Sequence, residues 1–198
     1  MKQLIFVFLF MGFFLHGYAQ IDFGKVKQDK KYCKHHNFPE NCEDVFTNNI
    51  CNSTNLLEIR YIWLQPDYLR KVRILAYDTL HGWRAVEYTD SITRVTDKEI
   101  CAKSLTKAVP LHPRSTFDSI FLQLKANDIF TLESEYALGH FANVGPRVMN
   151  GIYFKAGNKF RSYNFHDPYY LLEIQNYPYF KKVRNIIHLI TMDLQITE

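Results

Sequence analysis

The sequence of 198 residues lacks the short motifs by which many enzyme active sites are recognised. It contains no H-E-x-x-H metal motif, no G-x-S-x-G nucleophile motif, no phosphate-binding loop and no glycine-rich dinucleotide motif. Internal repeats, low-complexity tracts and linker-like segments are absent as well. The sequence therefore excludes repeat architectures and the motif-bearing enzyme classes, and it indicates one domain.

A strong excess of charge of one sign is also missing. The 24 Lys and Arg residues are nearly balanced by 20 Asp and Glu residues, and the net charge of +4 is scattered along the chain. A nucleic-acid interface requires basic residues clustered on one surface. We therefore predict that nucleic acid is not a partner.

Long apolar runs are confined to the first nineteen residues. Lys2 precedes an apolar stretch from Leu4 to Leu15, and Ala19 supplies the small residue that a signal peptidase accepts. This stretch is about a dozen residues long, whereas a membrane-spanning helix needs roughly twenty. We predict a bacterial signal peptide over 1–19, a mature chain from Gln20, and export to the periplasm or the extracellular space. The alternative is an uncleaved anchor; after cleavage no membrane span would remain.

Cysteines are few, and all of them follow the predicted signal: Cys33, Cys42, Cys51 and Cys101. An even number in an oxidising compartment predicts two disulfides, with three possible connectivities. The alternative is a zinc site built from the first three cysteines with His35 and His36. Structural zinc sites space their cysteines two to four residues apart, and here eight residues separate them. We predict disulfides, no metal and no cofactor.

The pattern of apolar residues divides the mature chain in two. Residues 20–55 are polar and lack periodicity, so we expect a loop-rich segment. Residues 56–198 form the predicted domain. Alternation predicts strands from Leu56 to Pro66 and over 72–78, 83–89 and 92–95. Residues 98–111 are ambiguous between a short helix and irregular structure, because Pro110 and Pro113 end any element there.

The second half of the domain predicts two helices and a hairpin. Ser115 is a candidate N-cap for a helix to Ala126, followed by extended structure over 129–132. Two runs over 151–155 and 160–165 flank a Gly-Asn turn, and Pro178 suits the first turn of a C-terminal helix. That helix carries one apolar face: Phe180, Val183, Ile187, Ile190 and Leu194. We predict an α+β fold, an antiparallel sheet (meander plus C-terminal hairpin) with two helices packed on one face.

The residues that offer acid–base chemistry lie in two short stretches. Glu133 and Glu135 share one face if their stretch is extended, and His140 follows them. His166 precedes Asp167, a carboxylate that orients an imidazole for general-base work. These five residues define one hypothesis, a secreted hydrolase. The plainer interpretation is a solvated strand face and a turn before Pro168.

The aromatic residues from Tyr153 to Phe180 allow two interpretations as well. They form either a stacking platform for sugars or peptides, or the packed side chains of a sheet and a helix. We favour packing. The sequence thus predicts a non-enzymatic exported domain that binds a protein, a peptide or an envelope component, with the hydrolase as the alternative.

Overall fold

A computed structural model describes residues 21–28, 50–64, 69–96, 99–105, 108–133, 150–165 and 178–196. Most of the predicted loop-rich segment therefore lies outside the described residues. A short 3-10 helix, η2 (Ile50–Asn52), precedes the first strand. The remaining elements are β1 (Leu57–Leu64), β2 (Leu69–Asp78), β3 (Gly82–Thr96), β4 (Glu99–Leu105), β5 (Val109–Pro113), α3 (Phe117–Ala126), β6 (Asn150–Ala156), β7 (Lys159–Phe165), α5 (Pro178–Thr191) and β8 (Leu194–Ile196).

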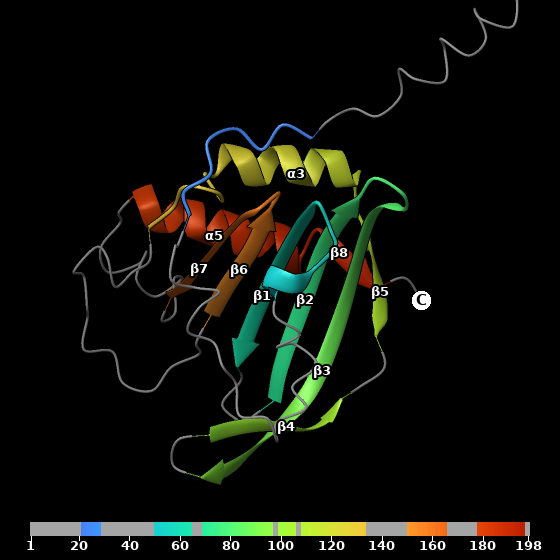
Figure 1. Ribbon diagram of the computed structural model, residues 1–198, viewed down its shortest axis with the longest axis vertical. Helices are drawn as coiled ribbons and strands as arrows, with labels where there is room; N and C mark the ends of the chain where they lie inside the picture. The colour runs from blue at the N-terminus through green and yellow to red at the C-terminus, as the bar shows by residue number, and fades with distance from the viewer. Residues whose placement is uncertain are drawn as a thin grey trace, which may run out of the picture.

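The strands form one antiparallel sheet in the order β7-β6-β1-β2-β3-β5-β8, and β4 pairs with the far end of β3 (Figure 1). The first three strands are a meander, as predicted, in which Ile59 lies opposite Leu75 and Leu75 opposite Ala85. The other side of β1 pairs with β6, so that Ile59 also lies opposite Phe154. The first strand of the meander is thereby an interior strand of the sheet, between β6 and β2.

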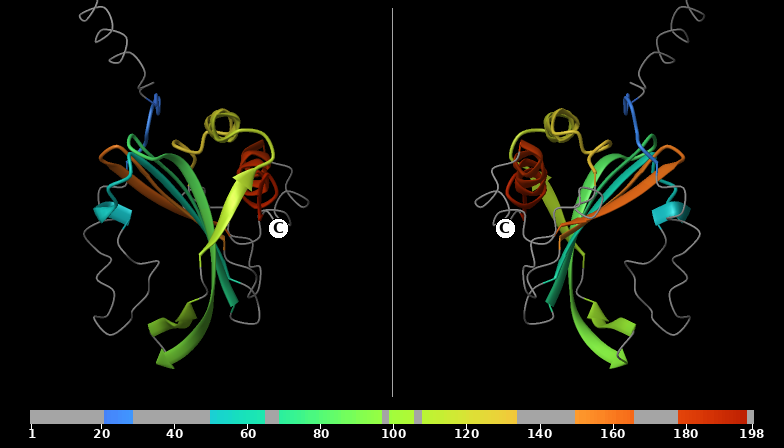
Figure 2. Two further views of the ribbon diagram at one scale, coloured as in Figure 1. Left: turned by 90° about the vertical axis from the view of Figure 1, so that its right-hand side faces the viewer. Right: turned by 90° about the vertical axis from the view of Figure 1, so that its left-hand side faces the viewer.

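Both helices lie on one face of the sheet, as Figure 2 shows. Alternate residues of β1 (Leu57, Ile59 and Tyr61) point into this face and are at most 3 % exposed. The apolar stripe of α5 covers them with Phe180, Val183, Ile187 and Ile190. The predicted fold class, an α+β domain with two helices on one face of an antiparallel sheet, is confirmed.

Short sequence signals correctly predicted a boundary of two elements, the β6–β7 hairpin and α5. The β6–β7 hairpin closes through Gly157 and Asn158, with Ala156 paired to Lys159. Gly157 has a φ of 60°, which places glycine at the first central position, where a type II′ turn requires it. The helix α5 begins at Pro178, as predicted. Its predicted stripe ends earlier than expected, because Leu194 belongs to β8.

Four local predictions were wrong. Residues 92–95 continue β3 instead of forming a separate strand, and the ambiguous stretch over 98–111 forms β4 and β5. Proline is accepted in β5 because this strand pairs with β3 at only two residues and with β8 at three. The N-cap of α3 is Thr116, whose hydroxyl accepts from the Ser119 amide, and not Ser115.

The fourth error concerns residues 129–132, which form a turn and not extended structure. Ile129, Phe130 and Leu132 are at most 5 % exposed, and they fill the space between α3 and the sheet. Asp128 begins this turn with a φ of 60°. The apolar run thus reflects burial of a loop, which residue periodicity alone does not separate from a strand.

Candidate functional site

The acid–base residues singled out in the sequence fall mostly outside the described part of the chain. Glu135, His140, His166 and Asp167 all lie there, so their hypothesis stays a prediction. Glu133 is described. One of its oxygens pairs with the Lys27 ammonium, and Oε2 accepts from Arg161 at 3.1 Å. Glu133 therefore ties the N-terminal segment to β7.

Glu133 also lines a recess of about 270 Å³ between the turn after α3 and the start of α5. Ligand pockets commonly enclose about 300–1,000 Å³. The other carboxylate of the recess, Asp128, is paired with the Lys182 ammonium. Both acids that line it are thus held by cations of the chain itself.

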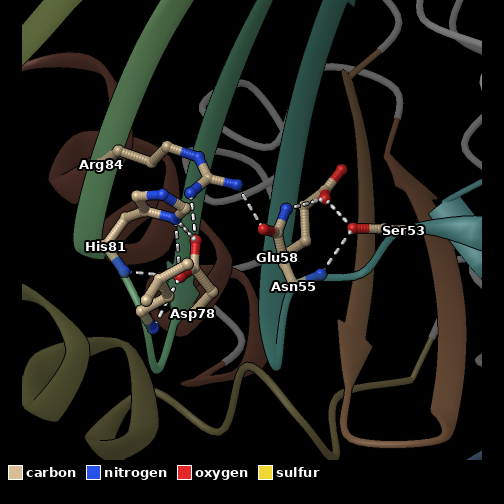
Figure 3. A network of polar contacts seen from close by, with 7 residues as sticks. Ser53, Asn55, Glu58, Asp78, His81 and Arg84 are labelled. Carbon is tan, nitrogen blue, oxygen red and sulfur yellow. Dashed lines mark hydrogen bonds and ion pairs between the residues drawn. The ribbon is translucent and has the colours of Figure 1, made fainter.

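A second polar site lies at the β2–β3 hairpin, between the strands predicted over 72–78 and 83–89 (Figure 3). Asp78 ends β2, and its Oδ1 accepts from the amides of Leu80 at 2.9 Å and His81 at 2.6 Å. The same oxygen lies 3.0 Å from Nδ1 of His81, and Oδ2 pairs with Arg84. The hydrogen bond from the His81 amide is the main reason that the pKa of Asp78 falls to about 2, with the Arg84 contact adding to it.

From Arg84 the polar contacts continue to the face of the sheet opposite α3 and α5 (Figure 2). Arg84 donates to Oδ1 of Asn55, and Nδ2 of the same side chain donates to Glu58 at 2.5 Å. Glu58 also accepts from Ser53 Oγ and from Nε of Arg60, each at 2.5 Å. Glu58 is 3 % exposed and Arg60 8 %, so a buried ion pair anchors the chain of contacts that ends at the exposed turn.

Lys155 of β6 joins this arrangement from the next strand. Its ammonium donates to the carbonyl oxygens of Ser53 and Asn55, at 2.8 Å for the latter. Burial lowers the pKa of Lys155, and the nearby Glu58 carboxylate opposes that effect. The loop between η2 and β1 is therefore held to β6 as well as to β3.

The His81–Asp78 pair has the geometry by which a carboxylate orients an imidazole, which is useful to a general base or a metal ligand. No group of three His, Cys, Asp or Glu side chains able to hold a metal ion occurs among the residues that the structure describes. The contacts of Asp78 go to the backbone of its own turn and to the neighbouring strand. The arrangement therefore acts first as a rigid support for the turn.

We call the exposed residues on this support the tip surface: Thr79, Leu80, His81 and Arg84 of the hairpin, with Leu122 of α3. Leu80 is 83 % exposed and Leu122 63 %. Trp83 connects the two elements, because its Nε1 donates to Asp118 at 2.8 Å and its ring stacks on Phe117. Leu122 lies one helical turn after Asp118 and so on the same face of α3.

Four of the described aromatic residues between Tyr153 and Phe180 pack in the core. Phe154, Tyr163, Phe165 and Phe180 are at most 1 % exposed. The Tyr163 hydroxyl donates to the Ile129 carbonyl at 2.7 Å, and burial raises the pKa of Tyr163 well above 10. These four rings are packing residues, so they supply no stacking platform.

No helix among the described residues is long and apolar enough to cross a membrane. Comparison with family models, with curated proteins and with solved structures found no match to this chain.

Proposed function

We propose that this protein is an exported, non-enzymatic domain that binds a protein or peptide through its tip surface. The observation that carries the proposal is the exposure of Leu80, 83 %, on a turn held by its own polar contacts. A solvated leucine on a turn adds nothing to the core. Its burial by a partner would contribute about 1.5–3 kcal/mol to binding.

The residues around Leu80 support the same proposal. Arg84 of the tip surface is of one of the types most enriched among the residues that dominate binding energies, and it follows Leu80 by four residues in the same hairpin. His81 offers a further exposed donor or acceptor, with 69 % of its side chain exposed. The surface thus combines an apolar centre with polar groups at its rim, as protein interfaces do.

The rigidity of the turn supports binding as well. Ordering a loop on association costs conformational entropy, about 1–2 kcal/mol for each residue fixed. Asp78 already fixes Leu80 and His81 through two backbone hydrogen bonds, and Arg84 braces Asp78 from the neighbouring strand. A partner that binds this turn would therefore find it already in the bound conformation.

Export is the second part of the proposal, and the state of one cysteine supports it. We propose that Cys51 of η2 is disulfide-bonded. Disulfides form and persist in oxidising compartments, which is where the apolar N-terminal segment would direct the chain. We therefore propose that the mature domain carries two disulfides among its four cysteines.

The strand register favours a particular set of pairings. Ser53 Oγ contacts Glu58. Across the sheet, Glu58 of β1 lies opposite Ala76 of β2, and Ala76 lies opposite Arg84 of β3. Cys101 lies opposite Thr93, nine residues beyond Arg84 along β3, a separation of about 30 Å. Cys51 is two residues from Ser53, and a disulfide needs α-carbons within about 7 Å. We propose that Cys51 pairs with Cys33 or Cys42 and that Cys101 takes the other one.

Peptide mapping of the unreduced protein tests these bridges. We expect a fragment that joins the peptide of Cys51 to that of Cys33 or Cys42. A fragment that joins Cys51 to Cys101 would contradict the pairing. Four alkylatable thiols in protein taken from the periplasm would contradict both disulfides. The alternative of a zinc site built from the cysteines would then be favoured.

Site-specific photo-crosslinking tests the binding surface. A photoreactive residue replaces Leu80 in one variant, and it replaces the exposed Gln123 of α3 in a matched control. Both variants are expressed in a bacterial host that exports the protein. We expect a discrete adduct from position 80 that is absent from position 123 and that weakens when Arg84→Ala is added. Equal adducts from both positions, or none from position 80, would contradict the tip surface as a binding site.

A purified chain from residue 20 onwards tests the hydrolase alternative. Glu133 does not support that alternative, since it is already paired with Lys27 and Arg161. We expect no hydrolysis of ester, peptide or glycoside substrates above the rate of a His140→Ala/His166→Ala variant. A rate that falls in this variant would establish the enzyme instead.

A further inference from the structure

The strand β7 ends the sheet on the side of β6, as Figure 1 shows. It has seven residues, which pair with β6 from Lys159 to Phe165 without a register shift. The strand at the other end of the order, β8, has only three residues. Within the described ranges, no strand pairs with the outer side of β7. β7 is therefore a long and regular sheet edge.

The hairpin turn determines which backbone groups of β7 point outward. Ala156 and Lys159 flank the two-residue turn, so they form a hydrogen-bonded pair, and such pairs alternate along an antiparallel ladder. Lys159 and every second residue after it thus direct their amide and carbonyl groups at β6. The same groups of Phe160, Ser162 and Asn164 point away from β6. β7 therefore presents a row of alternating donors and acceptors along its outer side.

The features that usually hinder pairing at a sheet edge are weak in β7. Edge strands are commonly protected by a proline, a bulge or a charge that an added strand would meet. β7 contains no proline and no bulge. The guanidinium of Arg161 lies 3.1 Å from the Glu133 carboxylate, and Arg161 is only 6 % exposed. An added strand would therefore meet an edge whose internal charge is already paired.

The sequence of β7 complements itself in an antiparallel arrangement. When two copies of β7 pair about Ser162, all seven residues lie opposite a residue of the second copy. Ser162 then faces Ser162 of the second copy, and Phe160 faces Asn164. These are the residues whose backbone groups point outward, so each of these pairs exchanges two hydrogen bonds. This register thus uses the whole outward row.

The charges of β7 favour the same register. Pairing about Ser162 sets Lys159 opposite Phe165 of the second copy and Arg161 opposite Tyr163. Each cation then meets an aromatic ring, an arrangement that is attractive. The register shifted by two residues toward the turn would instead set Arg161 against Arg161 of the second copy. Like charges directly opposite one another destabilise a strand pair.

We propose that two copies of this protein associate through β7, which pairs antiparallel about Ser162 and joins both sheets into one. The two-fold axis passes through the central pair, so the same surface serves in both copies. Main-chain hydrogen bonds supply the affinity, as in other cases of strand addition. An interface of one strand from each copy is small, so the dimer forms in a concentration-dependent way. This inference depends neither on the tip surface nor on export.

Sedimentation of the chain from residue 20 onwards, over a hundredfold range of concentration, tests the dimer. Ser162→Pro removes the amide donor of the central pair. That amide does not bond to β6, and an edge strand accepts proline where the amide faces outward. We expect this variant to dimerise about tenfold more weakly or worse, because the central hydrogen bonds are lost. Ser162→Thr keeps the amide and is the matched control, so it should dimerise as the wild type does.

Amide exchange of the wild type gives a test that needs no variant. The Ser162 amide should exchange quickly at low concentration and slowly at high concentration. The Arg161 amide bonds to β6 and should be protected throughout. A chain that stays monomeric over the whole range overturns the inference, as does a dimer that a folded Ser162→Pro variant leaves unchanged. A Ser162 amide protected equally at every concentration overturns it as well, because the edge would then be covered within one chain.

Discussion

Arg73 of β2 is a single side chain that joins the sheet to the end of α5. One of its terminal nitrogens donates to the carbonyl oxygens of Ile190, Thr191 and Leu194, at 2.6–2.9 Å. Its Nε donates to Glu87 of β3 at 2.6 Å. Carbonyl groups at the end of a helix lack partners within the helix, so a neighbouring strand supplies the cap here.

Replacing Arg73 by Met removes these contacts and leaves a carboxylate in the core. Glu87 is only 6 % exposed, and its nearest remaining cation, Lys71, lies 4.0 Å away. Removing one partner of a buried ion pair costs about 3–5 kcal/mol, so we expect a loss near 3 kcal/mol because Lys71 remains. With a urea m-value of about 2 kcal/mol per molar, the unfolding midpoint should fall by about 1.5 M.

Urea unfolding of the mature chain, followed by tryptophan fluorescence and circular dichroism, measures this loss. Lys181→Met is the control for introducing a methionine, and it should leave the midpoint within about 0.3 M of the wild type. Arg73→Met combined with Glu87→Met should be less destabilised than Arg73→Met alone, because no buried charge is left without its partner. A loss below about 1 kcal/mol, or a double variant that loses the sum of both single changes, would refute the reasoning.

Three further predictions concern single positions. Asp78 has a pKa of about 2 in the folded state against an ordinary 3.8, so its contribution is complete above about pH 4 and lost as the pH falls through 2; Asp78→Asn should flatten the pH dependence of unfolding in that window. Tyr163→Phe leaves the buried Ile129 carbonyl without its donor and should cost about 1–2 kcal/mol in urea unfolding, and an unchanged midpoint would contradict this bond. Gly157→Ala places a side chain at a φ of 60° and should lower stability by about 1 kcal/mol, whereas a more stable variant would contradict the turn assignment.

The elements that local signals define were predicted well. The Gly157–Asn158 turn and Pro178 mark their hairpin and helix by chemistry that acts over a few residues. Alternation along β1 also gave its two faces. The strands β4 and β5 were missed because the sequence around Pro110 gives a strong breaker signal. That signal is outweighed by pairing of β4 with the adjoining end of β3, and of β5 with both β3 and β8.

The candidate site illustrates a limit of a different kind. The alternating pattern places Glu58 on the polar face of β1, where exposure to solvent is expected. The side chain is instead buried by contacts from Ser53, Asn55 and Arg60. The link from Asn55 to Arg84 joins residues 29 positions apart. No spacing in a single sequence marks such a contact, so the Asp-Thr-Leu-His-Gly turn was visible while its support was not.

The position of β1 in the sheet has a consequence for the way the chain folds. β1 can pair with β2 as soon as both exist, but its other side waits for β6, and the hydrogen bond from Tyr61 to Asn150 spans 89 residues. Pairings between such distant residues form late, because a long loop must close before they contribute. During synthesis the meander therefore exposes the edge of β1 that later pairs with β6, until residue 156 has emerged. Folding should be slow on the scale of small domains, and a chain kept extended until it is complete would avoid pairing that open edge with a neighbour.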